Sequence, residues 1–230
     1  MNWNKIINWK LLAGSHDFPG PDGGTCINEA AIIAAGFKYM KVRSAADCPP
    51  CFSPVLSNYL IGINDMLPDA ERQKLMRFIL RLSGSADTPA IEQQRLELIV
   101  LRTVQIGVSS AMRAARLPDQ AAACAAVKTF AECGDVVASA ASAAWAAGDA
   151  SAASAAWAAW AASAASAAGD ASAASAAGDA SAAWAAGDAR RKLYADCIAI
   201  AEEAFAIGNQ ASAFDTMIVT ERLERARSCA

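Results

Sequence analysis

Apolar residues recur at helical spacing along much of the chain. The range 68–82 has the i, i+3, i+4, i+7 spacing of a buried helix face, and the residues at that spacing are Leu75, Phe78, Ile79 and Leu82. Apolar spacing and helix-start residues predict further helices at 26–35, 88–116, 118–133, 190–207 and 214–227. Alternation typical of a strand is found only at 38–43. We therefore expect an all-α fold built as a helical bundle.

A triplet repeat occupies residues 139–189. Each step is Ser-Ala-Ala, Trp-Ala-Ala or Gly-Asp-Ala, and the Gly-Asp pairs start at positions 148, 169, 178 and 187. Alanine favours helix, so we expect a long Ala-rich helical segment. Three residues turn a helix by about 300°, so the segment has no fixed apolar face. Gly followed by Asp has the pattern of a C-cap and then an N-cap, so the Gly-Asp pairs could break the segment into shorter helices. The alternative is that its small Ala surfaces let neighbouring helices approach closely. In either arrangement we expect the repeat to be a packing or spacer element.

Changes in composition divide the chain into four parts. We expect a loop-rich, Gly/Pro-rich and partly helical module at 1–67 and a bundle segment at 68–138. The repeat segment follows at 139–189, and C-terminal helices that pack back on the bundle are expected at 190–230.

Charge and length exclude some classes of protein. The chain has 230 residues and a net charge of −3, which argues against a basic nucleic-acid-binding protein. The long uncharged stretch at 150–169 consists of Ala, Ser, Trp and Gly, and is too weakly hydrophobic to span a membrane. An odd cysteine count, seven, without a recognisable signal peptide favours a reducing, cytoplasmic location.

The N-terminal region contains one candidate nucleophile. A Gly/Pro-rich loop at 14–24 precedes a helix for which Thr25 is the expected N-cap, so Cys26 falls in the first turn. A thiolate is stabilised there by free backbone N–H groups and the helix dipole. The single histidine of the chain, His16, could act as its base. The alternative is that both residues only pack and hydrogen-bond within an ordered loop.

A second cysteine motif, Cys48-Pro-Pro-Cys51, is compatible with a redox pair or with half of a zinc site. Zinc needs four ligands, and His16 and Cys26 could complete a Cys₃His set with the pair. Packing cysteines are again the alternative. The remaining cysteines are expected to be small core residues, and these are Cys124, Cys133, Cys197 and Cys229.

Three segments carry a resemblance to known proteins. Residues 9–31, WKLLAGSHDFPGPDGGTCINEAA, resemble the opening of a family of uncharacterised bacterial proteins, and residues 47–53 and 204–210 are also similar to that family. The resemblance implies a bacterial origin and no particular activity. The Ala-rich triplets separately resemble immunity proteins of bacterial toxin systems.

Together these features predict a non-enzymatic bacterial protein that acts through contacts with a protein partner or with itself, without a cofactor. One alternative is an enzyme or zinc-binding protein that uses His16, Cys26, Cys48 and Cys51. A second alternative is an immunity-type inhibitor with one dedicated toxin partner.

Overall fold

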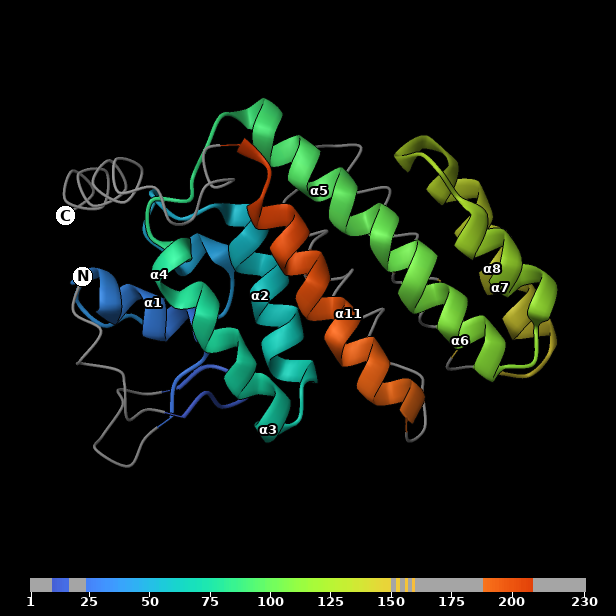
Figure 1. Cartoon of the computed structure of the whole chain (residues 1–230), viewed down its shortest axis with the longest axis horizontal. Coiled ribbons are helices and arrows are strands. Elements are labelled where there is room, and N and C mark those ends of the chain that lie inside the picture. Colours follow the sequence, from blue (N-terminus) through green and yellow to red (C-terminus); the bar gives the residue numbers. More distant parts are fainter. Residues whose placement is uncertain are drawn as a thin grey trace. The chain divides into compact units, whose positions relative to one another are not determined.

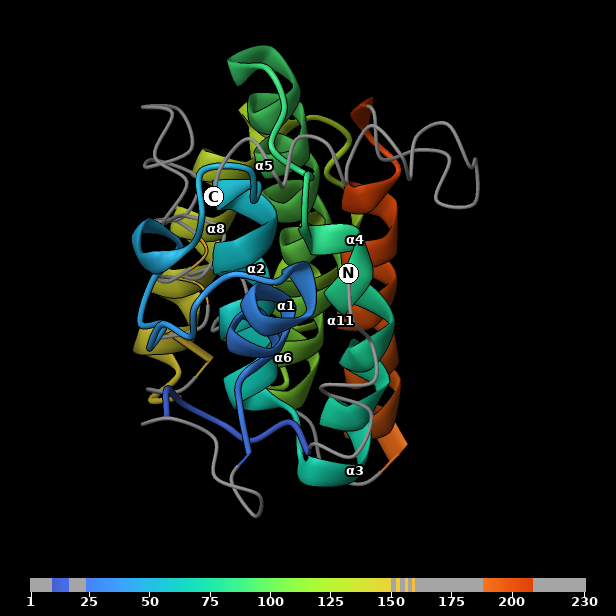
Figure 2. The ribbon, with the colours of Figure 1, turned by 90° about the vertical axis from the view of Figure 1, so that its left-hand side faces the viewer.

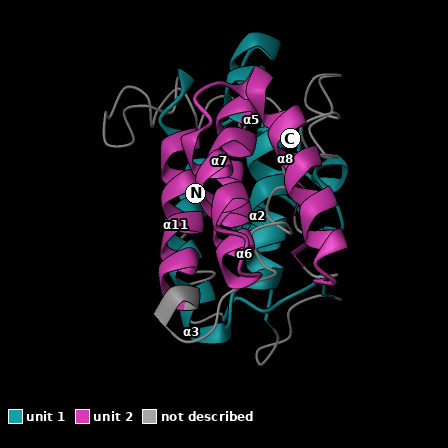
Figure 3. Cartoon of the chain, turned by 90° about the vertical axis from the view of Figure 1, so that its right-hand side faces the viewer, with its two compact units in different colours: residues 1–95, 205–230 teal, residues 96–204 magenta. Residues whose placement is uncertain are grey.

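The structure, a computed structural model, is all-α in the part that it describes, as the sequence predicts (Figure 1). It describes residues 10–16, 24–149, 152–153, 156, 159 and 188–208. Among these residues, β-type pairing occurs only at one isolated parallel bridge, between Leu11 and Thr25. The chain forms two compact units, one of residues 1–95 with 205–230 and one of residues 96–204 (Figure 3).

The first unit is built on short helices around a buried apolar core. Its elements are α1 (Ile27–Ala35), the 3₁₀ turn η2 (Ala45–Asp47), α2 (Pro54–Met66), α3 (Asp69–Arg72), the 3₁₀ segment η3 (Gln73–Phe78) and α4 (Ile79–Leu82). Helix α1 packs against both α2 and α4, and Figure 2 views this unit with α1 in front of α2. Helix α2 was not predicted as an element, although Ser53 and Pro54 carry the N-cap and N1 signals of a helix start.

The predicted helix at 68–82 is helical from Asp69 to Leu82, but its middle is a 3₁₀ segment. The residues at helical spacing, Leu75, Phe78, Ile79 and Leu82, are all fully buried, so the predicted apolar face is confirmed. The predicted strand at 38–43 is wrong. That segment has no strand partner in the described residues, and the backbone N–H of Val42 instead donates to the Glu29 carboxylate.

The second unit contains longer helices. Helix α5 (Pro89–Thr103) runs across the division between the units, which falls between Arg95 and Leu96. It continues through the π-helical turn η4 (Val104–Val108) into α6 (Ser109–Ala114), so the predicted range 88–116 is helical from Pro89 to Ala114 with one irregular turn. The other elements are α7 (Pro118–Ala126), α8 (Phe130–Ala146) and α11 (Asp188–Phe205). Helices α7 and α8 lie side by side (Figure 1).

The prediction of one helix at 118–133 is wrong, because α7 ends at Ala126 and α8 starts at Phe130. Thr129 and Glu132 form a capping box, in which each side chain accepts a backbone N–H from the other residue. This Thr-x-x-Glu spacing stops the first helix and starts the second, and it is present in the sequence.

The first Gly-Asp pair of the repeat behaves as predicted. Gly148 has φ of +75°, and the N–H groups of Gly148 and Asp149 donate to the carbonyls of Trp145 and Ala144, which closes α8. The Asp149 carboxylate then accepts the N–H of Ala152 at 2.9 Å, as an N-cap does.

Several predictions lie outside the described residues. These are the helix at 214–227, the core position of Cys229, the Gly-Asp pairs at 169 and 178, and residues 150–151, 154–155, 157–158 and 160–187 of the repeat. The observed units divide the chain within α5 and not at 67, 138 or 189, so the four-part organisation stays a prediction. In the described ranges no helix combines the length and the hydrophobicity that a membrane span requires.

Candidate functional site

The first turn of α1 is closed by a capping box with a cysteine as its N-cap. The Cys26 thiol accepts the N–H of Glu29 at 3.4 Å, and Oε2 of Glu29 accepts the N–H of Cys26 at 2.9 Å. The prediction of Thr25 as N-cap is therefore wrong by one residue. Thr25 instead pairs with the N-terminal strand-like segment, donating to Lys10 O and accepting from Leu12 N.

The carboxylate of Glu29 is fully buried and accepts hydrogen bonds from three segments of the chain. Besides Cys26, its partners are the N–H of His16 at 3.0 Å, Nδ1 of His16 at 3.1 Å and the N–H of Val42 at 3.2 Å. The hydroxyl of Tyr39 donates to the carbonyl of His16. Glu29 thus ties the loop before α1 and the segment after it to the start of the helix.

The structure brings His16 and Cys26 together through Glu29. Nδ1 of His16 and the N–H of Cys26 share one oxygen of that carboxylate. Among the described residues no hydrogen bond joins the imidazole directly to the thiol, so the predicted pair is linked by backbone and carboxylate and not by a proton-transfer contact.

Burial raises the pKa of the Cys26 thiol far above its ordinary value, and the nearby Glu29 carboxylate raises it further. Hydrogen bonds from the backbone N–H groups of Glu29 and Asn28 lower the pKa of the thiol, but by less than burial raises it. The thiol is therefore protonated at neutral pH. A catalytic cysteine needs the reverse, a thiolate in an electropositive setting.

A cavity of about 250 Å³ lies beside this thiol. It is formed by the loop before α1, the extended segment after it and one face of α2. Its walls are Gly14, Ser15, Cys26, Val42, Arg43, Ile61 and Asp65. A cavity with a thiol, two aliphatic side chains and two opposite charges is suited to hold a small polar molecule.

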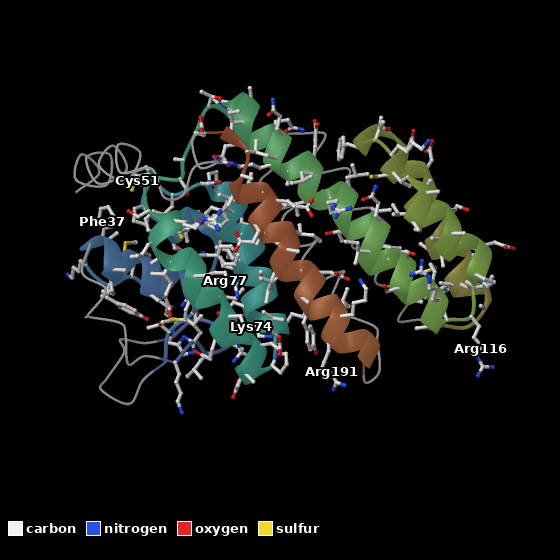
Figure 4. The ribbon with its side chains drawn as sticks, viewed as in Figure 1. Phe37, Cys51, Lys74, Arg77, Arg116 and Arg191 are labelled. Atoms are coloured by element: carbon white, nitrogen blue, oxygen red, sulfur yellow. The ribbon has the colours of Figure 1, made fainter. Side chains whose placement is uncertain are left out.

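The two residues of the predicted Cys-x-x-Cys site lie in different surroundings. Cys48 is half-buried at the end of η2, and burial raises the pKa of its thiol to about 12. Cys51 is buried, and its carbonyl accepts the N–H of Ala86 at 3.0 Å. Figure 4 shows Cys51 at the same end of the unit as Phe37.

No three His, Cys, Asp or Glu side chains of the described ranges are grouped so as to hold a metal ion. The structure thus relates Cys26 to His16 but does not gather His16, Cys26, Cys48 and Cys51 as one ligand set. A zinc site from these residues stays a prediction.

A second buried polar cluster was not predicted. The guanidinium of Arg95 is fully buried; Nη1 donates to Oε1 of Glu92 at 2.7 Å, and Nη2 donates to the carbonyl of Ile207 at 2.9 Å. Oε2 of Glu92 accepts the hydroxyl of Ser53, the N-cap of α2, at 2.5 Å. Burial raises the pKa of Glu92 and lowers that of Arg95. This cluster fastens Ile207 to the first turns of α5 and to the start of α2.

Sequence reasoning also missed Glu29, the residue that organises the site. Its signal was available, because Cys26-x-x-Glu29 has the spacing of a Ser/Thr-x-x-Glu capping box. The burial of the carboxylate and its bonds to His16 depend on long-range packing and had no signal in the sequence.

Comparison of the chain with family models, with curated proteins and with solved structures gives no match. The resemblance of residues 9–31 to bacterial proteins, and that of the repeat to immunity proteins, therefore stay predictions.

Proposed function

We propose that the protein is a non-enzymatic assembly module that associates through helix α8. The observation that carries this proposal is the exposure of Trp145, whose side chain is 70% accessible to solvent near the end of α8. The other large apolar side chains exposed in the described residues are less so, at 47% for Met40 and 39% for Leu80. Tryptophan is enriched at the centres of protein interfaces, because burying its ring removes a large apolar area from water.

The surroundings of Trp145 favour a second copy of the chain as the partner. Ser142 is exposed and, because it is three residues before Trp145, lies beside it on the surface of α8. Residues 136–148 contain no charged side chain, and the charged residues at the two ends of this range, exposed Asp135 and half-buried Asp149, are both acidic. Two such faces with small residues at their centre can meet across a two-fold axis, with each Trp145 packing on the other helix.

Sedimentation equilibrium over a wide concentration range tests this proposal. The wild-type chain is expected to self-associate, and Trp145→Ala is expected to raise the dissociation constant at least about 30-fold, since a central interface tryptophan contributes about 2 kcal/mol or more. Leu80→Ala is the matched control, because it truncates an exposed apolar residue elsewhere and should leave association unchanged.

A wild-type chain that stays monomeric throughout, or a Trp145→Ala variant that associates as strongly as wild type, would contradict the proposal. Circular dichroism of the Trp145→Ala variant measures its helix content. Unchanged helix content shows that weaker association comes from the interface and not from unfolding of α8.

A Cys26-dependent enzyme is the second candidate. The cavity beside the Cys26 thiol and the orientation of His16 by a buried carboxylate support it. The raised pKa of the thiol counts against it, and the thiol labelling described in the Discussion tests it directly.

A further inference from the structure

The cavity beside Cys26 carries two opposite charges that belong to different segments of the chain. Arg43 and Asp65 both line it, the first from the segment after α1 and the second from the last turns of α2. Both residues are solvent-exposed, so their charges lie toward the mouth of the cavity and not in its floor.

The carboxylate of Asp65 is held in place. Its Oδ1 accepts the N–H of Gly14 at 2.6 Å and Nδ2 of Asn64 at 3.0 Å, and the side chain of Asn64 is itself fully buried. The hydrogen bonds found for this carboxylate within the described residues all fall on Oδ1, which leaves Oδ2 to receive a ligand donor.

The backbone of Arg43 is fixed in the same way, because its N–H donates to Oδ2 of Asp47 at 2.8 Å. Within the described ranges its guanidinium forms no ion pair with a carboxylate. A guanidinium presents a planar fork of N–H donors that matches a carboxylate. The cavity therefore offers a donor fork and a carboxylate acceptor at once.

The remaining walls are neutral. Val42 and Ile61 are aliphatic, and the raised pKa of the Cys26 thiol leaves it uncharged at neutral pH. The cavity has a volume of about 250 Å³ and is open to solvent on one side, so it has room for a small molecule.

The start of α1 does not itself provide an anion site. The N–H of Ile27 donates to Oδ1 of Asn64 at 3.3 Å, and those of Cys26 and Glu29 are used within the capping box. The positive charge available to a ligand is thus that of Arg43, which excludes multiply charged anions such as phosphate as the favoured occupant.

From this arrangement we propose that the cavity binds a free α-amino acid with a small aliphatic side chain. The ligand carboxylate pairs with Arg43, its ammonium group pairs with Oδ2 of Asp65, and its side chain packs against Val42 and Ile61. Valine and leucine have the required size and charges. The residues of this site belong to the first unit, and the proposal does not rest on self-association through α8.

Isothermal titration of the full chain with L-valine and L-leucine tests the proposal. Saturable binding is expected, and isovalerate and isobutylamine, which lack one charge each, should bind at least about tenfold more weakly because each loses one ion pair. Arg43→Gln and Asp65→Asn should each weaken amino-acid binding to a similar degree. Asp65→Asn keeps an oxygen that can accept the N–H of Gly14, so the conformation of the loop at Gly14 should be unchanged.

Arg113→Gln is the control, since it removes an exposed arginine from the second unit and should leave binding unchanged. Absence of saturable binding to the folded wild-type chain would overturn the proposal. Isovalerate binding as tight as leucine binding would also overturn it, as would amino-acid affinity that both cavity variants retain.

Discussion

Glu29 holds His16 at two points, with Oε1 3.0 Å from the backbone nitrogen of His16 and Oε2 3.1 Å from its Nδ1. The carboxylate is fully buried, whereas the imidazole is 20% exposed. A buried carboxylate is costly unless its oxygens receive hydrogen bonds. The loop before α1 supplies two of the four hydrogen bonds that this carboxylate accepts, so loop and helix stabilise each other.

Glu29→Gln should therefore lower the free energy of unfolding by about 2–4 kcal/mol, because the amide cannot accept on both sides and leaves buried donors unpaired. Urea denaturation followed by circular dichroism measures the change.

Glu132→Gln is the matched control for this variant. Glu132 has the same capping-box position in α8 but is exposed, so the loss should be much smaller. Equal losses from the two variants would show that Glu29 acts only as a local cap.

Removal of the buried guanidinium of Arg95 should cost about 3–5 kcal/mol in Arg95→Met, since Glu92 then remains buried without its cation and the Ile207 carbonyl loses its donor. Arg102→Met provides the comparison. Arg102 pairs with Glu203 with both nitrogen–oxygen distances near 3 Å, but both side chains are more than a third exposed, so its loss should stay below about 1 kcal/mol. Thermal melts of both variants in the same buffer measure the two losses of stability, and the loss in Arg95→Met should be several times larger than that in Arg102→Met.

Arg116 ends α6 in a left-handed conformation, with φ of +59°, and it is the one non-glycine residue of the described chain with positive φ. Its side chain extends away from the ribbon (Figure 4). Arg116→Gly should raise stability by about 0.5–1 kcal/mol, because glycine adopts this conformation without strain.

The reverse substitution, from glycine to alanine at a left-handed position, should lower stability. Gly36 and Gly148 also have positive φ, and nothing lies within 4 Å of a Cβ added at either. Gly36→Ala and Gly148→Ala should thus each lose about 1–2 kcal/mol from backbone strain alone. A stabilising alanine at these positions would be inconsistent with the left-handed caps.

Stability should fall as pH rises above about 9. Burial raises the pKa of Cys124 and of Cys133 from 9.0 to about 11. Between these values the unfolded chain has released thiol protons that the folded chain retains, so each rise in pH favours unfolding, until the folded thiols ionise as well. Urea midpoints from pH 8 to 11 measure the slope. The double variant Cys124→Ala/Cys133→Ala should show a shallower slope, and an unchanged slope would contradict the assignment.

Local sequence signals accounted for much of the fold. The apolar spacing that ends at Leu82 and the Gly148-Asp149 cap depend on neighbours within a few residues, and both were predicted correctly. Two predictions were wrong because a second local signal was overlooked. The capping box at Thr129 separates α7 from α8, where one helix was predicted. Glu29 forms its capping box with Cys26, so Cys26 and not Thr25 is the N-cap of α1.

The candidate site was predictable only in part, because its decisive interactions join distant segments. Arg95 binds the carbonyl of Ile207, 112 residues away, and the Asp65 carboxylate binds Gly14, 51 residues away. Neither pairing has a periodic or motif signal. The protonated state of the Cys26 thiol likewise follows from burial, which the helix-start position alone does not reveal.

Burial raises the pKa of the Cys26 thiol, so that this cap of α1 is protonated at neutral pH. Iodoacetamide labelling of the native chain between pH 6 and pH 10, with and without EDTA, read by peptide mass spectrometry, tests it most directly. We expect slow labelling of Cys26 near neutral pH that the chelator does not change, because burial and the Glu29 carboxylate raise the pKa of its thiol. Rapid labelling of Cys26 alone near neutral pH would contradict a protonated cap and indicate a catalytic thiol. Labelling that begins only when EDTA is added would contradict it and indicate a zinc site.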